Sequence, residues 1–149
     1  MSGYMADVCY TRVYPLLKQY PNLIPYKFVD SSVNNNSELI GSTLVFQVET
    51  KNGDPALLIR AFDIPKEQTL DIGQFFEKFV DSLSESAKKL GVKKIIAAGS
   101  SGTISNYPLT TKYVVSNYIK DKEVIPLKDK FNFNGYDITN QCYLVRDLD

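Results

Sequence analysis

Between residues 72 and 90, apolar side chains recur at helical spacing. They are Ile72, Phe75, Phe76, Phe79, Val80, Leu83, Ala87 and Leu90. Steps of three and four residues predict one amphipathic helix with a broad apolar stripe. Gly91 follows where a left-handed residue commonly ends a helix, so we expect the helix to end there.

Two β-rich runs, "ELIGSTLVFQVET" and "PALLIRAFDI", precede this helix and are joined by "KNGDP". Asn52-Gly53 between such runs is a strong hairpin signal, so the two strands should be antiparallel. After Gly91, "VKKIIAAG" is typical of a buried strand. A strand, a helix and a second strand of these lengths predict a βαβ crossover, with residues 57–63 parallel to residues 92–98.

The rest of the chain predicts further elements around this centre. A second helix should begin at Pro108 and carry Leu109, Tyr113 and Val114, with Tyr118 as a further candidate. "KFNFNGYDI" and "CYLVRDL" should form two terminal strands. Residues 1–38 are rich in aromatic residues and proline, with a short helix expected at 15–20 and a polar loop at 30–38. We expect one domain over 1–149, with its core at 39–149.

Composition narrows the function classes. The 17 basic and 17 acidic residues balance, which argues against a nucleic-acid partner. No apolar run is long enough for a membrane span, and a signal peptide is not evident, so we expect a soluble, cytoplasmic protein without a membrane partner. The chain has no histidine, which excludes Ser-His and Cys-His catalysis and the usual zinc sites. We expect no metal, and reduced, packed side chains for Cys9 and Cys142.

The order of elements resembles the GNAT N-acyltransferases over about residues 39–149. In that family an asparagine follows the strand after the main helix, and a tyrosine comes seven residues later; Asn106 and Tyr113 keep this spacing, and "CYLVRDL" is similar to the last strand. The resemblance implies an α/β fold of the α+β type in three layers. Its central mixed sheet would have six to seven strands, with an antiparallel meander, one parallel pair and helices on both faces.

The resemblance also implies a reaction and a cofactor. An acyl group would pass from acetyl-CoA to the amine of a small molecule or protein, with Tyr113 as the general acid for the leaving thiolate. The coenzyme would lie against Ile64, Gln68, Asp71, Ile72, Gly73, Gln74 and Asn106. Glu49 and Asp63 are the candidate bases. Each has a plainer interpretation: Tyr113 as a half-buried aromatic residue, Asn106 as a turn or helix-cap residue, Glu49 on a solvated strand face, and Asp63 capping the loop.

The start of the main helix favours a second hypothesis. The family normally has Gln/Arg-x-x-Gly-x-Gly/Ala there, whereas this chain has "KEQTLDIGQFF". Asp71 is a natural N-cap and Gln74 completes a capping box, so a carboxylate would occupy the N–H groups that a pyrophosphate needs. The alternative is therefore a catalytically degenerate binding or regulatory module. It would be part of a longer protein with a neighbouring domain, or a homodimer through its C-terminal strands.

Two further sequence features bear on this choice. "GSSGTISN", residues 99–106, follows a parallel strand and is either a plain connection or a small anion nest. Pantetheine needs a gap between the carboxyl ends of strands 57–63 and 92–98. A closed sheet, or a gap filled by Phe62 or Tyr107, would argue against the enzyme.

Overall fold

The structure is a computed structural model of the 149-residue chain. It describes residues 4–7, 19–30, 38–100, 103–133 and 135–149. Most of the helix expected at 15–20, most of the polar loop and Cys9 lie outside the described residues.

Six strands form one mixed sheet in the order β1-β2-β3-β4-β5-β8. They are β1 (Tyr4–Asp7), β2 (Leu23–Asp30), β3 (Glu38–Glu49), β4 (Pro55–Asp63), β5 (Lys94–Ala98) and β8 (Cys142–Asp147). Only β4 and β5 are parallel; the other neighbours in this sheet are antiparallel. The α+β class, the meander and the parallel pair are thus confirmed. Because β2 pairs with β3, the sheet extends into the segment that the sequence analysis set apart as N-terminal.

The β3–β4 hairpin forms where Asn52-Gly53 predicted it. Gly53 has φ +91°, and the Thr50 N–H donates to the Asp54 carbonyl at 2.9 Å. Glycine tolerates this left-handed conformation at little cost. The turn therefore fixes the pairing register of β3 and β4.

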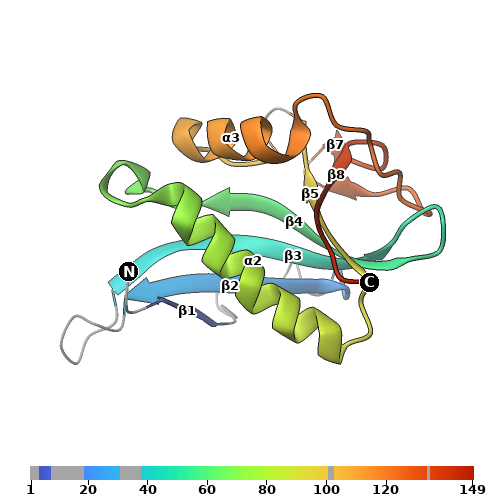
Figure 1. Cartoon of the computed structure of the whole chain (residues 1–149), viewed down its shortest axis with the longest axis horizontal. Helices are drawn as coiled ribbons and strands as arrows, with labels where there is room; N and C mark the ends of the chain where they lie inside the picture. The colour runs from blue at the N-terminus through green and yellow to red at the C-terminus, as the bar shows by residue number, and fades with distance from the viewer. Residues whose placement is uncertain (1–3, 8–18, 31–37, 101–102, 134) are drawn as a thin grey trace.

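Helix α2 (Ile72–Lys89) crosses in front of the sheet in Figure 1. Its predicted stripe is buried from Phe75 to Ala87, together with Ser84. Leu90 is the exception, because it is the C-cap residue and lies 57% exposed. Gly91, with φ +72°, ends the helix as expected.

A second helical segment packs on the same face of the sheet as α2. Helix α3 (Pro108–Val114) begins at the predicted proline and continues into η2 (Val115–Ile119), a π-helical turn. Within α3, Thr110 and Val114 are buried, whereas Leu109 is 42% exposed. One apolar cluster joins α2, α3 and this face of the sheet.

The other face carries a second apolar cluster under a chain segment of little regular structure. Leu127, Phe133, Ile138 and Cys142 pack there against side chains of β3, β4 and β5. The helices of the described residues therefore cover one face. The opposite layer, as far as the structure describes it, consists of the segment around residues 125–138.

The run "KFNFNGYDI" is not one strand, as expected, but a small hairpin of β6 (Asn132–Phe133) and β7 (Tyr136–Asp137). Gly135 has φ +80°, which turns the chain back on itself. The prediction overlooked a turn-forming glycine within a β-rich run.

Cys142 is a free, buried cysteine, and burial raises its pKa to about 12, so this thiol is a packed, protonated side chain. No helix within the described ranges is long and apolar enough to cross a membrane. The same residues contain no group of three or more Asp, Glu or Cys side chains placed to hold a metal ion.

Candidate functional site

The carboxyl end of β4 bends through a β-bulge. Ser42 of β3 pairs with Asp63, but Leu44 pairs with Arg60, so β4 carries one extra residue there. Ala61, with φ +59°, sits at the bulge. The extra residue turns Phe62 to the α2 face, where it is 1% exposed inside the apolar cluster. A bulge re-aims side chains in this way.

Beyond the bulge, β4 bonds to the chain's own connecting segment. The Ala61 N–H donates to the Thr103 carbonyl at 2.9 Å, and the Phe62 N–H donates to the Ile104 carbonyl at 2.8 Å. β5 has already diverged, since its parallel pairing with β4 ends at Ile59 and Ala97. The gap between the two strands exists, and residues 103 and 104 fill it.

Asp63 caps the turn that follows this segment. One carboxylate oxygen accepts from the Asn106 N–H at 2.8 Å and from the Ser105 hydroxyl at 3.1 Å; the other accepts from the Asn106 side chain at 3.0 Å. Asp63 does act as a cap, but of the distant turn at Ser105 and Asn106. Asn106 is a turn residue whose side chain bonds to Asp63 and does not cap α3, whose N-cap is Tyr107. Both oxygens of the candidate base are occupied by this turn.

Ser100 and Thr103 likewise bond to each other. Their hydroxyls lie 2.9 Å apart, and the Thr103 N–H donates to the Ser100 carbonyl at 3.0 Å. Thr103 is fully buried. These contacts are those of a connection that satisfies its own polar groups.

Glu67 is buried and holds the first turn of α3. Its carboxylate accepts from the Leu109 N–H at 2.9 Å, and from both the Thr110 N–H and hydroxyl at 2.8 Å. Burial acts to raise the pKa of Glu67, but the bonds from Leu109 and Thr110 outweigh it, and the net pKa is lowered. A carboxylate thus occupies the N–H groups at the start of this helix.

Asp71 does the same for α2, as the sequence predicted. Its Oδ1 accepts from the Gln74 N–H at 3.0 Å. Of the other residues expected to hold coenzyme A, Ile64 is fully buried, Gln68 is exposed, and Ile72 is half-buried. The start of α2 is therefore capped by its own carboxylate.

Gly73 makes room for Tyr113. A Cβ added at Gly73 would lie 2.6 Å from Cε1 of the Tyr113 ring and 3.1 Å from its Cδ1. No side chain larger than hydrogen fits while the ring stays in place. The glycine is explained by helix packing, without a phosphate.

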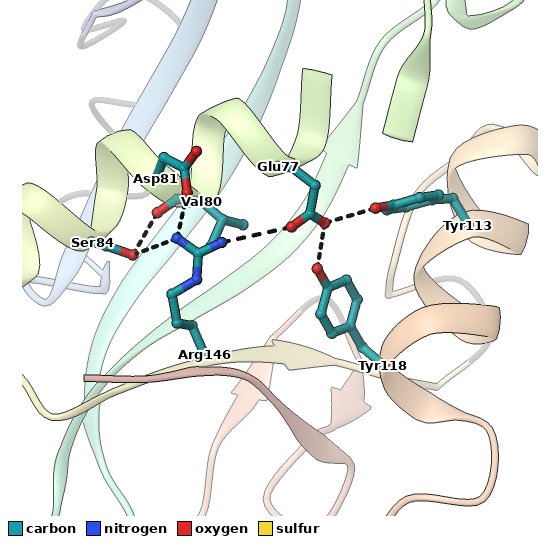
Figure 2. Close-up of polar contacts among 7 residues, drawn as sticks. All are labelled: Glu77, Val80, Asp81, Ser84, Tyr113, Tyr118 and Arg146. Atoms are coloured by element: carbon teal, nitrogen blue, oxygen red, sulfur yellow. Dashed lines mark hydrogen bonds and ion pairs between the residues drawn. The ribbon is translucent and has the colours of Figure 1, made fainter. Parts of the chain in front are cut away.

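The Tyr113 hydroxyl donates to Glu77 Oε2 at 2.7 Å, and the Tyr118 hydroxyl donates to the same oxygen, as Figure 2 shows. Burial, followed by the bond to Glu77 and its charge, raises the pKa of Tyr113 to about 12. The same causes raise the pKa of Tyr118 further. Both phenols therefore stay protonated at neutral pH.

The π-helical turn brings these two phenols together. Residues five positions apart on an α-helix point about 140° apart, but the Lys120 N–H bonds to the Val115 carbonyl, a five-residue step. The wider turn places Tyr118 beside Tyr113, with ring centroids 6.4 Å apart. Single π-helical turns of this kind are frequent at functional sites.

Arg146 of β8 completes the cluster from the sheet. Its guanidinium lies 3.6 Å from Glu77 and 2.5 Å from Asp81, and it donates to the Ser84 hydroxyl at 3.3 Å. We refer to Glu77, Asp81, Ser84, Tyr113, Tyr118 and Arg146 as the Glu77 cluster. It joins α2, α3, η2 and β8 through polar contacts.

Glu49 lies far from Asp63 and Tyr113. It pairs with Pro55 at the start of β4, whereas Asp63 is the last residue of that strand, and Tyr113 lies against Gly73 in the first turn of the helix that follows. Eight residues of strand separate Pro55 from Asp63, a distance of about 26 Å. The Glu49 side chain faces Lys128 at 3.4 Å. Glu49 and Tyr113 cannot act on one substrate in this arrangement.

A shallow groove of about 360 Å³ lies between the start of α2 and α3. Gln68, Leu70, Ile72, Leu109, Lys112 and Tyr113 are among its lining residues. Of the site residues proposed from the sequence, Gln68, Ile72 and Tyr113 come together at this groove. The sequence did not point to Glu77, Tyr118 or Arg146 as site residues, because neither a π-helical turn nor the contact between α2 and β8 leaves a local pattern in the sequence.

Comparison with known proteins gives little beyond this geometry. The chain matches no family profile, and no curated protein matches it. A solved structure titled "The crystal structure of KacTA-DNA complex" contains a chain that aligns over 99% of this chain and 85% of its own length, with 10% identity and a TM-score of 0.48. Similarity at that level does not establish a shared fold or function.

Proposed function

We propose that this chain is a non-catalytic binding module with a GNAT-like fold. The place where coenzyme A would bind, at the carboxyl end of β4 and the start of α2, is called the coenzyme A seat below, and the chain's own residues fill it. The observation that carries the proposal is the pair of backbone bonds from Ala61 and Phe62 to Thr103 and Ile104. A pantetheine chain would need this edge of β4. To bind, it would have to displace two bonds and the buried Thr103 side chain.

Two further contacts support the same proposal. The Asp71 carboxylate caps α2 where a pyrophosphate would bind, and an N-cap contributes about 1 kcal/mol. The Tyr113 ring lies over Gly73, in the space next to that cap. A ligand at the start of α2 would therefore compete with a negative charge and with an aromatic ring.

The GNAT-like fold in this proposal is supported by the order of the strands. An antiparallel meander, one parallel pair and a closing antiparallel strand agree with the sheet that the resemblance implies. The three-layer arrangement with helices on both faces stays a prediction, because the described helices cover one face.

The acyltransferase remains the second candidate, and one observation favours it. Tyr113 borders the groove at the start of α2, where the resemblance places the general acid. To protonate a leaving thiolate, its hydroxyl would have to leave Glu77 Oε2, and a pKa raised to about 12 makes it a weaker acid than an ordinary phenol. The amine's proton would need another acceptor, since Glu49 is remote.

Isothermal titration with acetyl-CoA distinguishes the two candidates. We expect no binding by the wild-type chain at about 1 mM ligand. Asp71→Gly is the informative variant, with Asp129→Gly, at an exposed position outside the helices, as the control for the same change of charge. Binding by Asp71→Gly alone would identify the carboxylate as the obstacle. Micromolar binding by the wild type would overturn the proposal, and release of free thiol with an amine would establish the enzyme.

A further inference from the structure

Arg60 is a buried cation on the face of the sheet opposite α2. It follows Ala56 and Leu58 at two-residue spacing along β4, and both of those residues belong to the second apolar cluster. Arg60 is 5% exposed. Its guanidinium carbon lies 4.4 Å from the centre of the Phe133 ring and 5.9 Å from that of Tyr136.

No described residue gives this guanidinium a hydrogen bond or an ion pair within contact distance. Its Nε is fully enclosed without a partner. Asp63 is a nearby carboxylate whose charge acts on Arg60, but Ser105 and Asn106 take up its oxygens. Burial dominates, and it lowers the pKa of Arg60.

A buried charge in this state is costly. Buried arginine is normally paired with an anion, and stacking on an aromatic ring offsets only part of the lost hydration. An enclosed polar nitrogen without a partner calls for a bound water or ion. The guanidinium fork matches the two oxygens of a carboxylate or phosphate group.

We propose that Arg60 anchors a binding site for a small oxyanion, a carboxylate or a phosphate group, beneath the β6–β7 hairpin. The hairpin has only two paired positions, Asn132 with Asp137 and Phe133 with Tyr136. Phe133 is buried in the second apolar cluster, so the side of the hairpin nearer to solvent is that of Tyr136. Tyr136, which stands over the guanidinium, is itself 42% exposed. An anion therefore reaches Arg60 from this side.

The site is separate from the coenzyme A seat. Leu58 and Arg60 point to one face of β4, whereas Phe62, α2 and the Glu77 cluster lie on the other. The inference thus goes beyond the proposed function and does not depend on it. Either one can fail while the other holds.

The test follows side-chain N–H resonances of the ¹⁵N-labelled chain during titration with sodium phosphate or sodium acetate at constant ionic strength. We expect the Arg60 Nε–H resonance to shift and saturate with a midpoint of about 1–10 mM. The Arg146 Nε–H resonance, on the other face, should stay in place. Saturation with phosphate alone or with acetate alone identifies the class of anion. Loss of the resonance in Arg60→Lys assigns it.

Two variants test anion binding at Arg60 without relying on the assignment of its Nε–H resonance. Arg60→Met should abolish the increase in Tm that the bound anion gives the wild type, whereas Arg146→Met, which carries the same charge change, should keep it. If neither anion shifts the Arg60 resonance, the guanidinium binds water alone and the inference is overturned. An equal, unsaturated shift at both arginines would also overturn it.

Acetyl-CoA added to the same sample separates this inference from the proposed function. Shifts of the Gly73 and Gln74 amides would refute the closed coenzyme seat and leave the Arg60 result untouched. A shift at Arg60 alone would mean that the phosphates of the coenzyme bind at the second site, which supports the inference.

Discussion

At the scale of single residues, Glu67 has the most consequential placement. Its carboxylate satisfies two backbone N–H groups and one hydroxyl of α3 while lying 3% exposed. Because its pKa is lowered from the ordinary 4.5, the folded state prefers the charged form. The stability from this shift is present above pH 4.5 and is lost as the pH falls through the lower, folded pKa.

We expect Glu67→Gln to destabilise the protein by about 2 kcal/mol at pH 7, because an amide group can supply only one of the two acceptors and places N–H groups against the Leu109 N–H. The difference from wild type should shrink below pH 4.5. Urea unfolding between pH 3 and 7 measures it. Glu85→Gln, on the exposed face of α2, is the control and should stay near zero throughout.

Tyr113 has the opposite pH dependence. Its pKa is raised from 10.0 to about 12, so the stability from this shift is present below pH 10 and is lost as the pH rises toward 12. We expect wild-type stability to fall in this range more steeply than that of Tyr113→Phe. Unfolding by urea at several alkaline pH values measures both slopes. Tyr107→Phe is the control and should keep the slope of the wild type. If its slope is as shallow as that of Tyr113→Phe, the assignment of the pH dependence to Tyr113 is wrong.

At the scale of elements, the contact between α2 and α3 depends on Gly73. Glycine near the start of a helix is ordinarily less favourable than alanine by up to about 1 kcal/mol. Here an alanine Cβ would lie 2.6 Å from the Tyr113 ring. The ring or one of the helices must therefore move.

We expect Gly73→Ala to destabilise the wild type but to stabilise a Tyr113→Ala background. A double-mutant cycle, measured by urea unfolding, gives the coupling, which should be about 1 kcal/mol or more. Gln74→Ala, one residue further along α2, should show no coupling to Tyr113. If Gly73→Ala stabilises both backgrounds, the ring does not lie on the glycine.

The elements also show what the sequence could and could not predict. The β3–β4 hairpin, α2 and the Asp71 cap depend on residues close together in the chain, so local patterns sufficed. Gly135 carried a comparable turn signal, yet alternating apolar residues on both sides suggested one continuous strand. The depth of Arg60 depends on Phe133 and Tyr136, more than 70 residues away, and no local pattern encodes that contact.

The residues of the candidate site likewise fall into those that the local sequence predicts and those that depend on tertiary contacts. The Asp71 cap follows from short-range hydrogen bonding, which the residue types and their spacing predict. Asp63 instead caps a turn more than 40 residues away, at Ser105 and Asn106, and no local pattern predicts those partners. The Glu77 cluster needs a π-helical turn to bring Tyr118 beside Tyr113 and needs β8 to bring Arg146. Contacts between elements that lie so far apart in the sequence are decided by tertiary packing. Sequence reasoning therefore found Tyr113 but missed its partners.

At the scale of the whole molecule, the Glu77 cluster attaches the edge strand β8 to both helices. β8 pairs with β5 on one side only, and Arg146 adds two carboxylate contacts to α2. Each exposed ion pair contributes little alone, about 0–1 kcal/mol. In this cluster the Glu77 carboxylate also accepts hydrogen bonds from two phenols. The loss of Arg146 should therefore also weaken the contacts of α3 and η2 with Glu77.

We therefore expect Arg146→Met to reduce global stability by about 1 kcal/mol and to accelerate amide hydrogen exchange in β8 while leaving the β2–β3 pairing protected. The Tyr113 and Tyr118 ring resonances should shift, because Glu77 loses its cationic partner. Lys94→Met is the matched control. It removes another cation paired with β8, through Asp147 at 3.2 Å, but it contacts neither helix. Faster exchange in β8 without any shift of the tyrosine rings in Arg146→Met would mean that the strand and the helices are stabilised independently.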